Sequence, residues 1–282
     1  MFLSLNGISI FVKKNFRKAD PRKQTIFFLH GFGGCSNDWN EIISMFGSGF
    51  QILTIDLPGF GKSGKPKSDK FYQTDFLVQL IDEILCELQF AEVVLAGYSM
   101  GGRLALQFAH KHPEKVKALI LESTSPGIKT KAERQLRIKS DVELIFFINK
   151  NSLKDFFTFW QNQPLFVSQK NLPVKKQQSI LLNKINANSK IGLTNSLKNF
   201  GQGEMENLWN KLPRIKIPTL LLTGALDAKY SKIQHEMSEL LPNSTHKIID
   251  EAGHNLHLEK PEVFVNLVRE FLKNINDKTD LK

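Results

Sequence analysis

Short apolar runs that alternate with helical stretches constrain the fold of this chain more than any other feature of its sequence. Apolar residues recur at helical spacing over Asp75 to Leu88 and over Met100 to His110. Continuously apolar strands of this kind are typical of parallel sheets that are covered on both faces. The apolar runs are Ile26 to Leu29, Ile52 to Ile55, Val93 to Ala96 and Leu119 to Leu121. We therefore predict the α/β class, with a mostly parallel central sheet and helices on both faces.

The alternation stops over residues 127–212, which hold amphipathic, Lys-rich and Phe-rich pieces but no convincing buried strand. An insertion of this length is too long for an ordinary connection and is typical of a functional lid. We predict a core made of residues 1–126 and 213–282 and a helical cap made of residues 127–212. After the cap the pattern resumes with an apolar run at 219–222, a helix at 230–241, a strand at 246–249 and a helix at 262–272.

The composition limits the kinds of partner. The net charge is +10, but Lys and Arg are scattered in short runs such as Lys175-Lys176, so we expect a solvated basic surface and no nucleic-acid site. The most apolar short run, Leu144 to Ile148, falls far below the ~20 residues that cross a bilayer. The segment Met1 to Val12 has no export-signal pattern and alternates like a strand. We expect no membrane partner, and a location in the cytoplasm or, for an organelle-encoded protein, in the plastid stroma.

Two other patterns give no support for a bound group. Cys35 and Cys86 have no ligand spacing, so neither a disulfide framework nor a zinc site is indicated. Residues 59–64 satisfy G-x-G-x-x-G, but Pro58 and a lysine-rich continuation do not open the helix that a dinucleotide site requires. We predict that the protein uses no cofactor and no metal.

A candidate nucleophile, Ser99, is the centre of the G-x-S-x-G pentad Gly97 to Gly101. The pentad alone is common, but this one follows the predicted strand Val93 to Ala96 and opens a helix. In such a nucleophile elbow the glycines relieve crowding and the helix N-terminus favours negative charge on the serine oxygen. We predict that Ser99 is catalytic.

A serine hydroxyl needs a base to react at neutral pH, and the base needs an acid that orients it. His254 lies in a loop after the last predicted strand, and Asp227 lies in a loop after the strand that ends at Leu222. The order Ser, Asp, His is that of the α/β-hydrolase fold. His257 can form an H-x-x-H pair with His254, but a third metal ligand is lacking. We predict a triad of Ser99, Asp227 and His254.

The residues after the first buried strand are candidates for an oxyanion hole. His30 to Gly34 follow the strand that ends at Leu29, where a backbone N–H can act together with the N–H after the nucleophile. Phe32 and Met100 are therefore the predicted backbone donors.

Three arginines are candidate ligands for an anion. Arg103 lies in the first turn of the helix after the elbow, where the helix dipole disfavours a cation unless something anionic compensates. Arg134 and Arg137, near the start of the cap, add two guanidinium groups suited to carboxylates. Two alternatives stay open: Arg103 pairs with a surface carboxylate, and Arg134 and Arg137 are simply solvated.

Six groups of residues together resemble the family of 2-succinyl-6-hydroxy-2,4-cyclohexadiene-1-carboxylate synthases. The match runs from His30 to the C-terminal helix. The groups are Gly97 to Arg103; Pro126-Gly127 with Glu133-Arg134 and Arg137; Phe159-Trp160 with Gln163-Pro164; Gly201 to Gly203 before Leu208-Trp209; Gly224 with Asp227 and Lys229; and Gly253 to Asn255 with His257.

The resemblance implies a cofactor-independent lyase of menaquinone or phylloquinone biosynthesis. Such an enzyme eliminates pyruvate from a small polyanionic substrate, a cyclohexene that carries succinyl, carboxylate and enolpyruvyl groups. By this analogy Ser99, activated by His254 and Asp227, removes a ring proton instead of attacking a carbonyl, and the oxyanion donors stabilise an enolate-like charge.

The resemblance also implies which residues bind the substrate. The family usually has a further arginine near residues 183–188, where this chain has only Lys184, a cation without the bidentate fork. The residues assigned to the substrate site are His30, Tyr98, Arg103, Arg134, Arg137, Trp160 and Lys184.

Two other functions stay open. A serine hydrolase of an ester, a thioester or a carbon–carbon bond would use the same triad covalently. A receptor built on this fold would bind a ligand without consuming it. The sequence does not distinguish menaquinone from phylloquinone biosynthesis, and it gives no oligomeric state.

Overall fold

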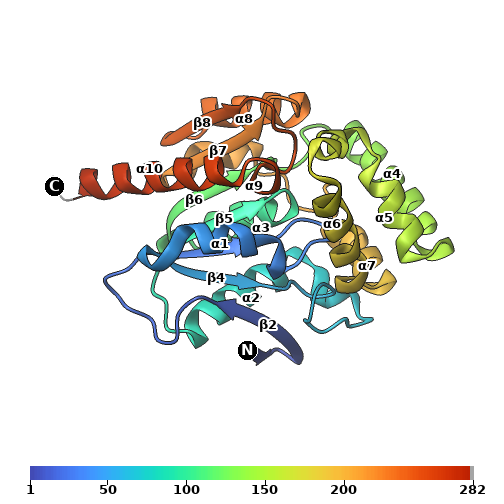
Figure 1. Cartoon of the computed structure of the whole chain (residues 1–282), viewed down its shortest axis with the longest axis horizontal. Coiled ribbons are helices and arrows are strands. Elements are labelled where there is room, and N and C mark those ends of the chain that lie inside the picture. Colours follow the sequence, from blue (N-terminus) through green and yellow to red (C-terminus); the bar gives the residue numbers. More distant parts are fainter. Residues whose placement is uncertain (280–282) are drawn as a thin grey trace.

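The computed structural model of the protein describes residues 1–279 and shows a central sheet surrounded by helices (Figure 1). The strands are β1 (Phe2–Leu5), β2 (Ile8–Lys14), β3 (Thr25–Leu29), β4 (Gln51–Ile55), β5 (Val93–Tyr98), β6 (Val116–Glu122), β7 (Thr219–Gly224) and β8 (Ser244–Ile249). The α-helices are α1 (Asn40–Phe46), α2 (Thr74–Glu87), α3 (Met100–Lys111), α4 (Lys131–Lys150), α5 (Leu153–Gln161), α6 (Val174–Ala187), α7 (Lys190–Phe200), α8 (Ala228–Leu240), α9 (Leu256–Glu259) and α10 (Pro261–Thr279).

The strands form one 8-stranded sheet in the order β1-β2-β4-β3-β5-β6-β7-β8. The pairs β1/β2 and β2/β4 are antiparallel, and all other neighbours are parallel. The predicted fold class is therefore confirmed, and each predicted apolar run lies within a strand. Because the central strands are parallel, the loops that follow β3, β5, β7 and β8 meet at one edge of the sheet, where ligands bind in open α/β sheets.

Alternate side chains of the central strands enter two separate cores. Phe27 and Leu29 of β3 belong to the core that contains residues of α2 and α3. Ile26 and Phe28 of the same strand belong to the core that contains residues of α1 and α10. This alternation explains why the strand sequence is continuously apolar, since each face of the sheet is covered by helices.

Between β6 and β7 the chain leaves the sheet and forms α4 to α7, together with the short 3-10 helix η5 (Pro164–Asn171). These helices lie together at one side of the sheet, on the right in Figure 1. Side chains cap the N-termini of three of these helices. The hydroxyls of Thr130, Ser152 and Ser189 accept hydrogen bonds from backbone N–H groups in the first turns of α4, α5 and α7. From here on, "the cap" means residues 127–212.

The cap meets the core where α7 crosses the loop after β4. A Cβ atom added to Gly192 of α7 would lie 2.0 Å from the carbonyl oxygen of Gly59. Close by, Asn188 forms an isolated antiparallel bridge with Phe60, and its side-chain amide donates to the carbonyl oxygen of Gly33 at 3.0 Å. The cap is thus fixed to the core by backbone contacts that leave no room for a side chain at position 192.

Gly192→Ala is expected to destabilise the protein by about 1–3 kcal/mol, because the added methyl group must push two backbones apart. Thermal unfolding would measure this as a lower Tm. Gly49→Ala is the control, because a Cβ atom at Gly49 would have no heavy atom within 4 Å. Equal Tm values for the two variants would contradict the close contact between α7 and the loop after β4.

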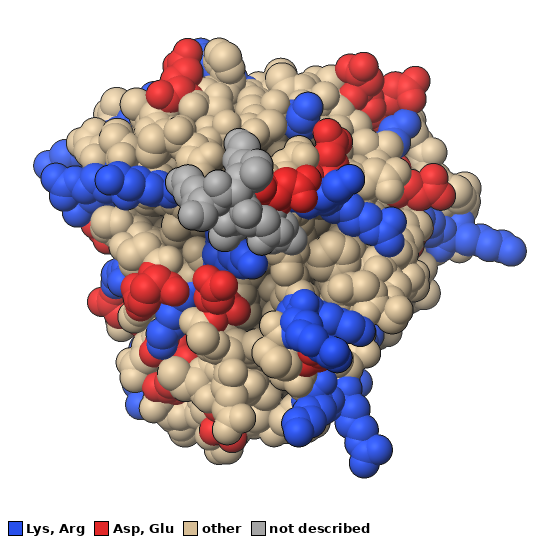
Figure 2. All heavy atoms as spheres, turned by 90° about the vertical axis from the view of Figure 1, so that its left-hand side faces the viewer, with Lys and Arg blue, Asp and Glu red and all other residues tan. Residues whose placement is uncertain are grey.

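The charged side chains of the core form separate groups on the face opposite the cap. On this face, which Figure 2 shows, Lys and Arg are interrupted by Asp, Glu and uncharged surface. In the cap, Lys and Arg outnumber Asp and Glu. Across residues 1–279, no helix has both the length and the apolar character to span a membrane.

Candidate active site

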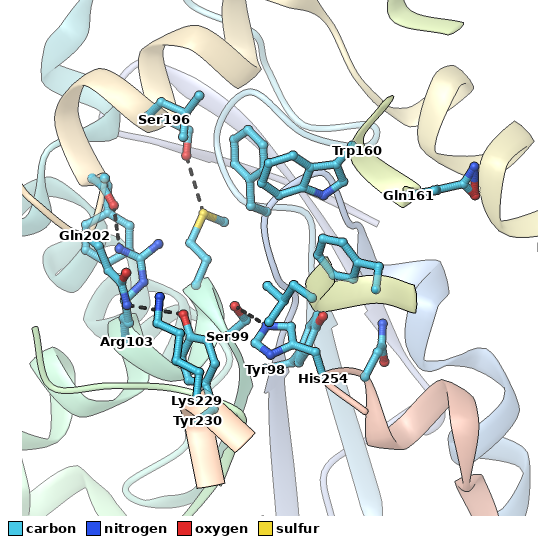
Figure 3. Close-up of a pocket in the computed structure, with 18 of the residues that line it drawn as sticks. Tyr98, Ser99, Arg103, Trp160, Gln161, Ser196, Gln202, Lys229, Tyr230 and His254 are labelled. Carbon is cyan, nitrogen blue, oxygen red and sulfur yellow. Dashed lines mark hydrogen bonds between the residues drawn. The ribbon is translucent and has the colours of Figure 1, made fainter. Parts of the chain in front are cut away.

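Ser99 occupies a strained turn between β5 and α3. Its φ of 50° and ψ of −105° are rare for a residue with a side chain, and such strain clusters at functional sites. A Cβ atom at Gly101 would lie 2.1 Å from the carbonyl oxygen of Leu29, so α3 can begin against β3 only with glycine there. The turn presents the Ser99 hydroxyl to His254 in a pocket (Figure 3).

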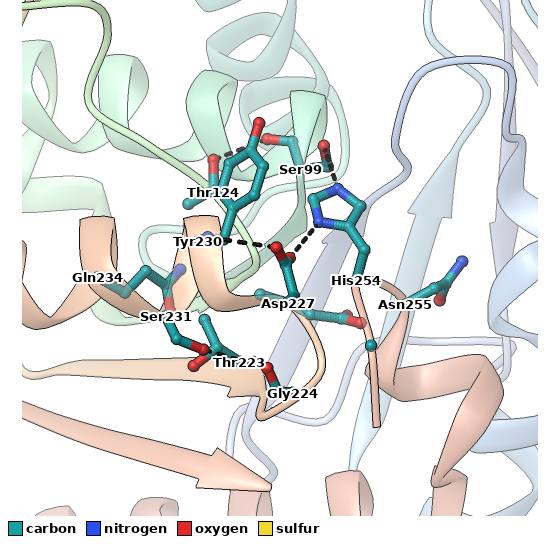
Figure 4. Close-up of polar contacts among 12 residues, drawn as sticks. Ser99, Thr124, Thr223, Gly224, Asp227, Tyr230, Ser231, Gln234, His254 and Asn255 are labelled. Atoms are coloured by element: carbon teal, nitrogen blue, oxygen red, sulfur yellow. Dashed lines mark hydrogen bonds and ion pairs between the residues drawn. The ribbon is translucent and has the colours of Figure 1, made fainter. Parts of the chain in front are cut away.

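Ser99, His254 and Asp227 form a hydrogen-bonded chain (Figure 4). The distance from Ser99 Oγ to His254 Nε2 is 3.1 Å, and the distance from His254 Nδ1 to Asp227 Oδ2 is 2.6 Å. The carboxylate beside Nδ1 holds a proton on that nitrogen, so Nε2 can accept the serine proton. The side chains of His254 and Asp227 are only 1% and 2% exposed, which protects this contact from water.

Neighbouring groups hold the two partners of Ser99 in place. Asp227 is the N-cap of α8, where its Oδ1 accepts from the backbone N–H of Tyr230 at 3.2 Å. Glu259 holds the loop that carries His254, because its carboxylate accepts from the backbone N–H groups of Gly253 at 2.7 Å and Asn255 at 3.3 Å. The triad geometry is therefore fixed by residues of the core.

A second buried histidine–carboxylate pair lies beside the triad. Nδ1 of His257 is 2.7 Å from Oε2 of Glu122, and both side chains are 1% exposed. The His257 ring stacks on Trp39 with centroids 4.1 Å apart. The Tyr98 ring contacts both His257 and His254, at 5.1 and 5.3 Å between centroids. The pair joins the end of β6 to α9.

The pocket beside Ser99 is lined by residues of the core and the cap. Phe32, Tyr98 and Met100 of the core line it, and so does Trp160 of the cap. The Trp160 ring contacts Phe32 with centroids 5.4 Å apart, so the cap closes one side of the cavity with an aromatic wall. The two residues whose backbone N–H groups were predicted to form the oxyanion hole, Phe32 and Met100, both belong to this lining.

Arg103 brings a buried positive charge to the pocket. It is 8% exposed, donates to the carbonyl oxygen of Phe200 at 2.9 Å, and lies over the ring of the same residue. Among residues 1–279, no carboxylate pairs with it. Burial, with the nearby charge of Arg137, lowers the pKa of Arg103 to about 10, so it stays protonated at neutral pH. A buried cation without a carboxylate partner is costly and is suited to an anionic ligand.

Two cap cations also line the pocket, and both are held by protein groups. Arg137 of α4 pairs with Asp141, with 2.9 Å between Nε and Oδ1, and donates to Oε1 of Gln202 at 2.9 Å. Burial raises the pKa of the Asp141 carboxyl. Lys184 of α6 donates to the carbonyl oxygen of Gly33 at 3.4 Å. Arg103, Arg137 and Lys184 thus bring positive charge to the pocket from α3, α4 and α6.

Two residues that the sequence assigned to the substrate site, His30 and Arg134, do not line the pocket. His30 is fully buried, and both ring nitrogens are used: Nδ1 donates to the carbonyl oxygen of Gly31 at 2.8 Å, and Nε2 accepts from the N–H of Leu57 at 3.0 Å. Burial lowers the pKa of His30, which keeps the ring neutral. Arg134 donates to the carbonyl oxygens of Gly203 and Glu204, so it ties α4 to the loop after α7.

The pocket lining also contains polar residues that the sequence did not assign to the substrate site, among them Gln202, Lys229 and Tyr230. Gln202 follows α7, and the other two lie in the first turn of α8. Lys229 was one of the residues in the family pattern, and its spacing of two residues from Asp227 was the signal that could have placed it here.

No group of three or more His, Cys, Asp or Glu side chains that could hold a metal ion occurs within residues 1–279. His257, the only potential ligand partner that the sequence suggested for His254, is paired with Glu122 instead.

Comparison with known proteins places this site in a family. Residues 24–261 match the alpha/beta hydrolase fold family. The chain is 40% identical to the putative 2-succinyl-6-hydroxy-2,4-cyclohexadiene-1-carboxylate synthase of Bacillus subtilis over 89% of this chain and 91% of that protein. It is 24% identical to Protein PHYLLO, chloroplastic, of Arabidopsis thaliana over 98% of this chain and 17% of that protein. Among solved structures, MenH from S. aureus superimposes with a TM-score of 0.88 at 35% identity, over 94% of this chain and 98% of that one.

Proposed function

The chain belongs to the alpha/beta hydrolase fold family and, within it, to the 2-succinyl-6-hydroxy-2,4-cyclohexadiene-1-carboxylate synthases, and we propose that it catalyses the reaction for which that family is named. It is a lyase that eliminates pyruvate from 2-succinyl-5-enolpyruvyl-6-hydroxy-3-cyclohexene-1-carboxylate. The product is 2-succinyl-6-hydroxy-2,4-cyclohexadiene-1-carboxylate, an intermediate of menaquinone or phylloquinone biosynthesis. One observation carries the proposal: a hydrogen-bonded Ser99–His254 pair and the unpaired cation of Arg103 line the same pocket.

In the proposed mechanism Ser99 acts as a base. His254 Nε2 draws the proton from the Ser99 hydroxyl, and the serine oxygen takes a proton from the ring carbon. The electrons of the C2–H bond form a C2=C3 double bond, the electrons of the existing C3=C4 double bond move to C4=C5, and the C–O bond to the enolpyruvyl group at C5 breaks. The leaving enolate of pyruvate takes up a proton, which His254 can return, and is released as pyruvate. No water enters and no covalent bond to Ser99 forms.

The protein stabilises the charge that develops in this reaction. The enolate-like oxygen would accept hydrogen bonds from the backbone N–H groups of Phe32 and Met100, the two proposed oxyanion donors. Arg103, Arg137 and Lys184 line the pocket and would bind the carboxylates. Tyr98 and Trp160 would contact the ring of the substrate.

The proposed partner is a small polyanionic molecule and not a nucleic acid or a membrane. The separated charge groups on the core face support this, because nucleic-acid binding needs a continuous basic patch. The proposed location is the cytoplasm of a bacterium or the stroma of a plastid. The bacterial relative and the relative named chloroplastic support these two locations.

Release of pyruvate from the enolpyruvyl cyclohexene tests the proposal, with lactate dehydrogenase and NADH as the coupled readout. We expect release by the wild type far above the uncatalysed rate, without a burst and without labelling of Ser99 during turnover. Ester hydrolysis without pyruvate release would contradict the lyase and favour the serine hydrolase.

Arg103→Met is expected to lower kcat/KM for pyruvate release by about 10-fold to 100-fold, the cost of losing a hydrogen bond to a charged group. Methionine keeps most of the side-chain volume but removes the charge. Arg269→Met is the matched control, because Arg269 also donates to a backbone carbonyl, that of Met45, but lies outside the pocket. The Tm of both variants shows whether a lower kcat/KM comes from lost substrate binding or from a less stable fold. Equal kcat/KM values for the two variants would remove Arg103 from the substrate site.

A further inference from the structure

Lys229 differs from the other cations of the pocket in having no fixed polar partner. Arg103, Arg137 and Lys184 each donate to a protein oxygen. Lys229 makes no hydrogen bond or ion pair with any residue of the described chain, and its Nζ lies 5.6 Å from the centroid of the Tyr230 ring. Its side chain is exposed, although it lines the same pocket. Its ammonium group is therefore available to a ligand at the solvent side of the cavity.

The neighbouring Tyr230 offers a second donor. Its hydroxyl oxygen accepts a hydrogen bond from Nε2 of Gln202 at 3.3 Å. Within residues 1–279, no hydrogen bond uses the hydroxyl hydrogen of Tyr230. The residue is 6% exposed and lines the pocket. A buried hydroxyl with an unused hydrogen is a donor that a ligand oxygen can satisfy.

The position of Lys229 and Tyr230 is fixed relative to the triad. Both lie in the first turn of α8, directly after Asp227. The Tyr230 ring contacts the His254 ring with centroids 4.6 Å apart, and its backbone N–H donates to Asp227. Figure 3 shows Lys229 and Tyr230 on the same side of the pocket as Arg103 and Gln202, with Ser99 and His254 beside them. Both donors thus lie on one wall of the pocket, in the helical turn that follows the triad carboxylate.

We propose that the Lys229 ammonium and the Tyr230 hydroxyl form a carboxylate subsite that binds the end of the succinyl chain of the substrate. This inference rests on the proposed function. The succinyl carboxylate is the one at the end of a flexible chain, and Lys229, the outer of the two donors, is exposed. Ammonium and phenol donors together suit a carboxylate, which accepts up to four hydrogen bonds.

The subsite predicts a change in KM and little change in kcat, because it touches the substrate away from the bond that breaks. Lys229→Met is expected to raise KM about 10-fold, less than a fully buried charge pair would give, because the side chain is partly screened by water. Tyr230→Phe, which keeps the ring against His254, is expected to raise KM about 3-fold. We expect kcat to stay within about 2-fold in both variants.

The test compares two substrates and one control variant. Lys232→Met is the control, because Lys232 lies on the same helix but does not line the pocket. With a substrate analogue whose succinyl carboxylate is converted to the primary amide, wild type and Lys229→Met should have similar KM values. If Lys229→Met leaves KM for the natural substrate unchanged, or raises KM equally for the amide, the subsite is absent. Pyruvate release by the wild type tests the proposed function separately, so the two ideas can fail independently.

Discussion

Ser99→Ala is expected to lower kcat for pyruvate release by about 10³-fold, within the range that general base catalysis contributes. The substitution removes the oxygen that lies 3.1 Å from His254 Nε2 and that the proposed mechanism uses to take the ring proton. Coupled pyruvate detection at saturating substrate would measure the loss directly.

Two control measurements show whether the loss of kcat comes from the missing serine oxygen. Binding of the reaction product by Ser99→Ala should be close to that of the wild type, because Arg103 and the other cations are unchanged. Ser44→Ala, a substitution in α1 outside the pocket, should keep full activity. If Ser99→Ala keeps more than about one tenth of the wild-type kcat, Ser99 is not the base and the proposed mechanism is wrong.

Asp227→Asn is expected to lower kcat by about 10³-fold or more, although the substitution replaces only one carboxylate oxygen with an amide nitrogen. The Asp227 carboxylate accepts from His254 Nδ1 at 2.6 Å and so holds the proton on that nitrogen. An asparagine amide can donate to Nδ1 instead, which moves the ring proton to Nε2 and blocks its use as an acceptor for Ser99. Steady-state kinetics with the enolpyruvyl substrate would measure the change in kcat.

Stability should hardly change in this variant. Asp227 also caps α8 through Tyr230 N–H, and asparagine caps helices about as well as aspartate. Asp250→Asn, at an exposed position after β8, is the control and should be fully active. If Asp227→Asn has the kcat and the Tm of the wild type, the carboxylate does not decide which ring nitrogen of His254 carries the proton.

The central sheet was predictable because burial on both faces leaves a local signal. The apolar runs at β3, β4, β5 and β7 are continuous, and each is bounded by residues that end strands. The contacts between cap and core were not predictable in this way. Gly192 packs against Gly59, which lies far away in the sequence, and nothing near either glycine indicates its partner.

The triad geometry followed from local motifs and their order, whereas the roles of other polar residues depend on partners that the sequence does not reveal. His30 and Arg134 lie outside the pocket lining and are hydrogen-bonded to backbone carbonyl and N–H groups, which carry no sequence signature. His257 is paired with Glu122, which lies 135 residues earlier in the chain. Tertiary contacts of this kind decide which charged or polar side chains remain free for a ligand.

The hydrogen bond between Ser99 and His254 joins residues that are 155 positions apart. During synthesis the N-terminal part of a chain emerges and begins to fold first. The elbow and the cap would therefore be made before β7 and β8, whose following loops carry the acid and the base. A nascent chain on the ribosome would hold an unactivated serine, and reactivity would begin only when the last strands join the sheet.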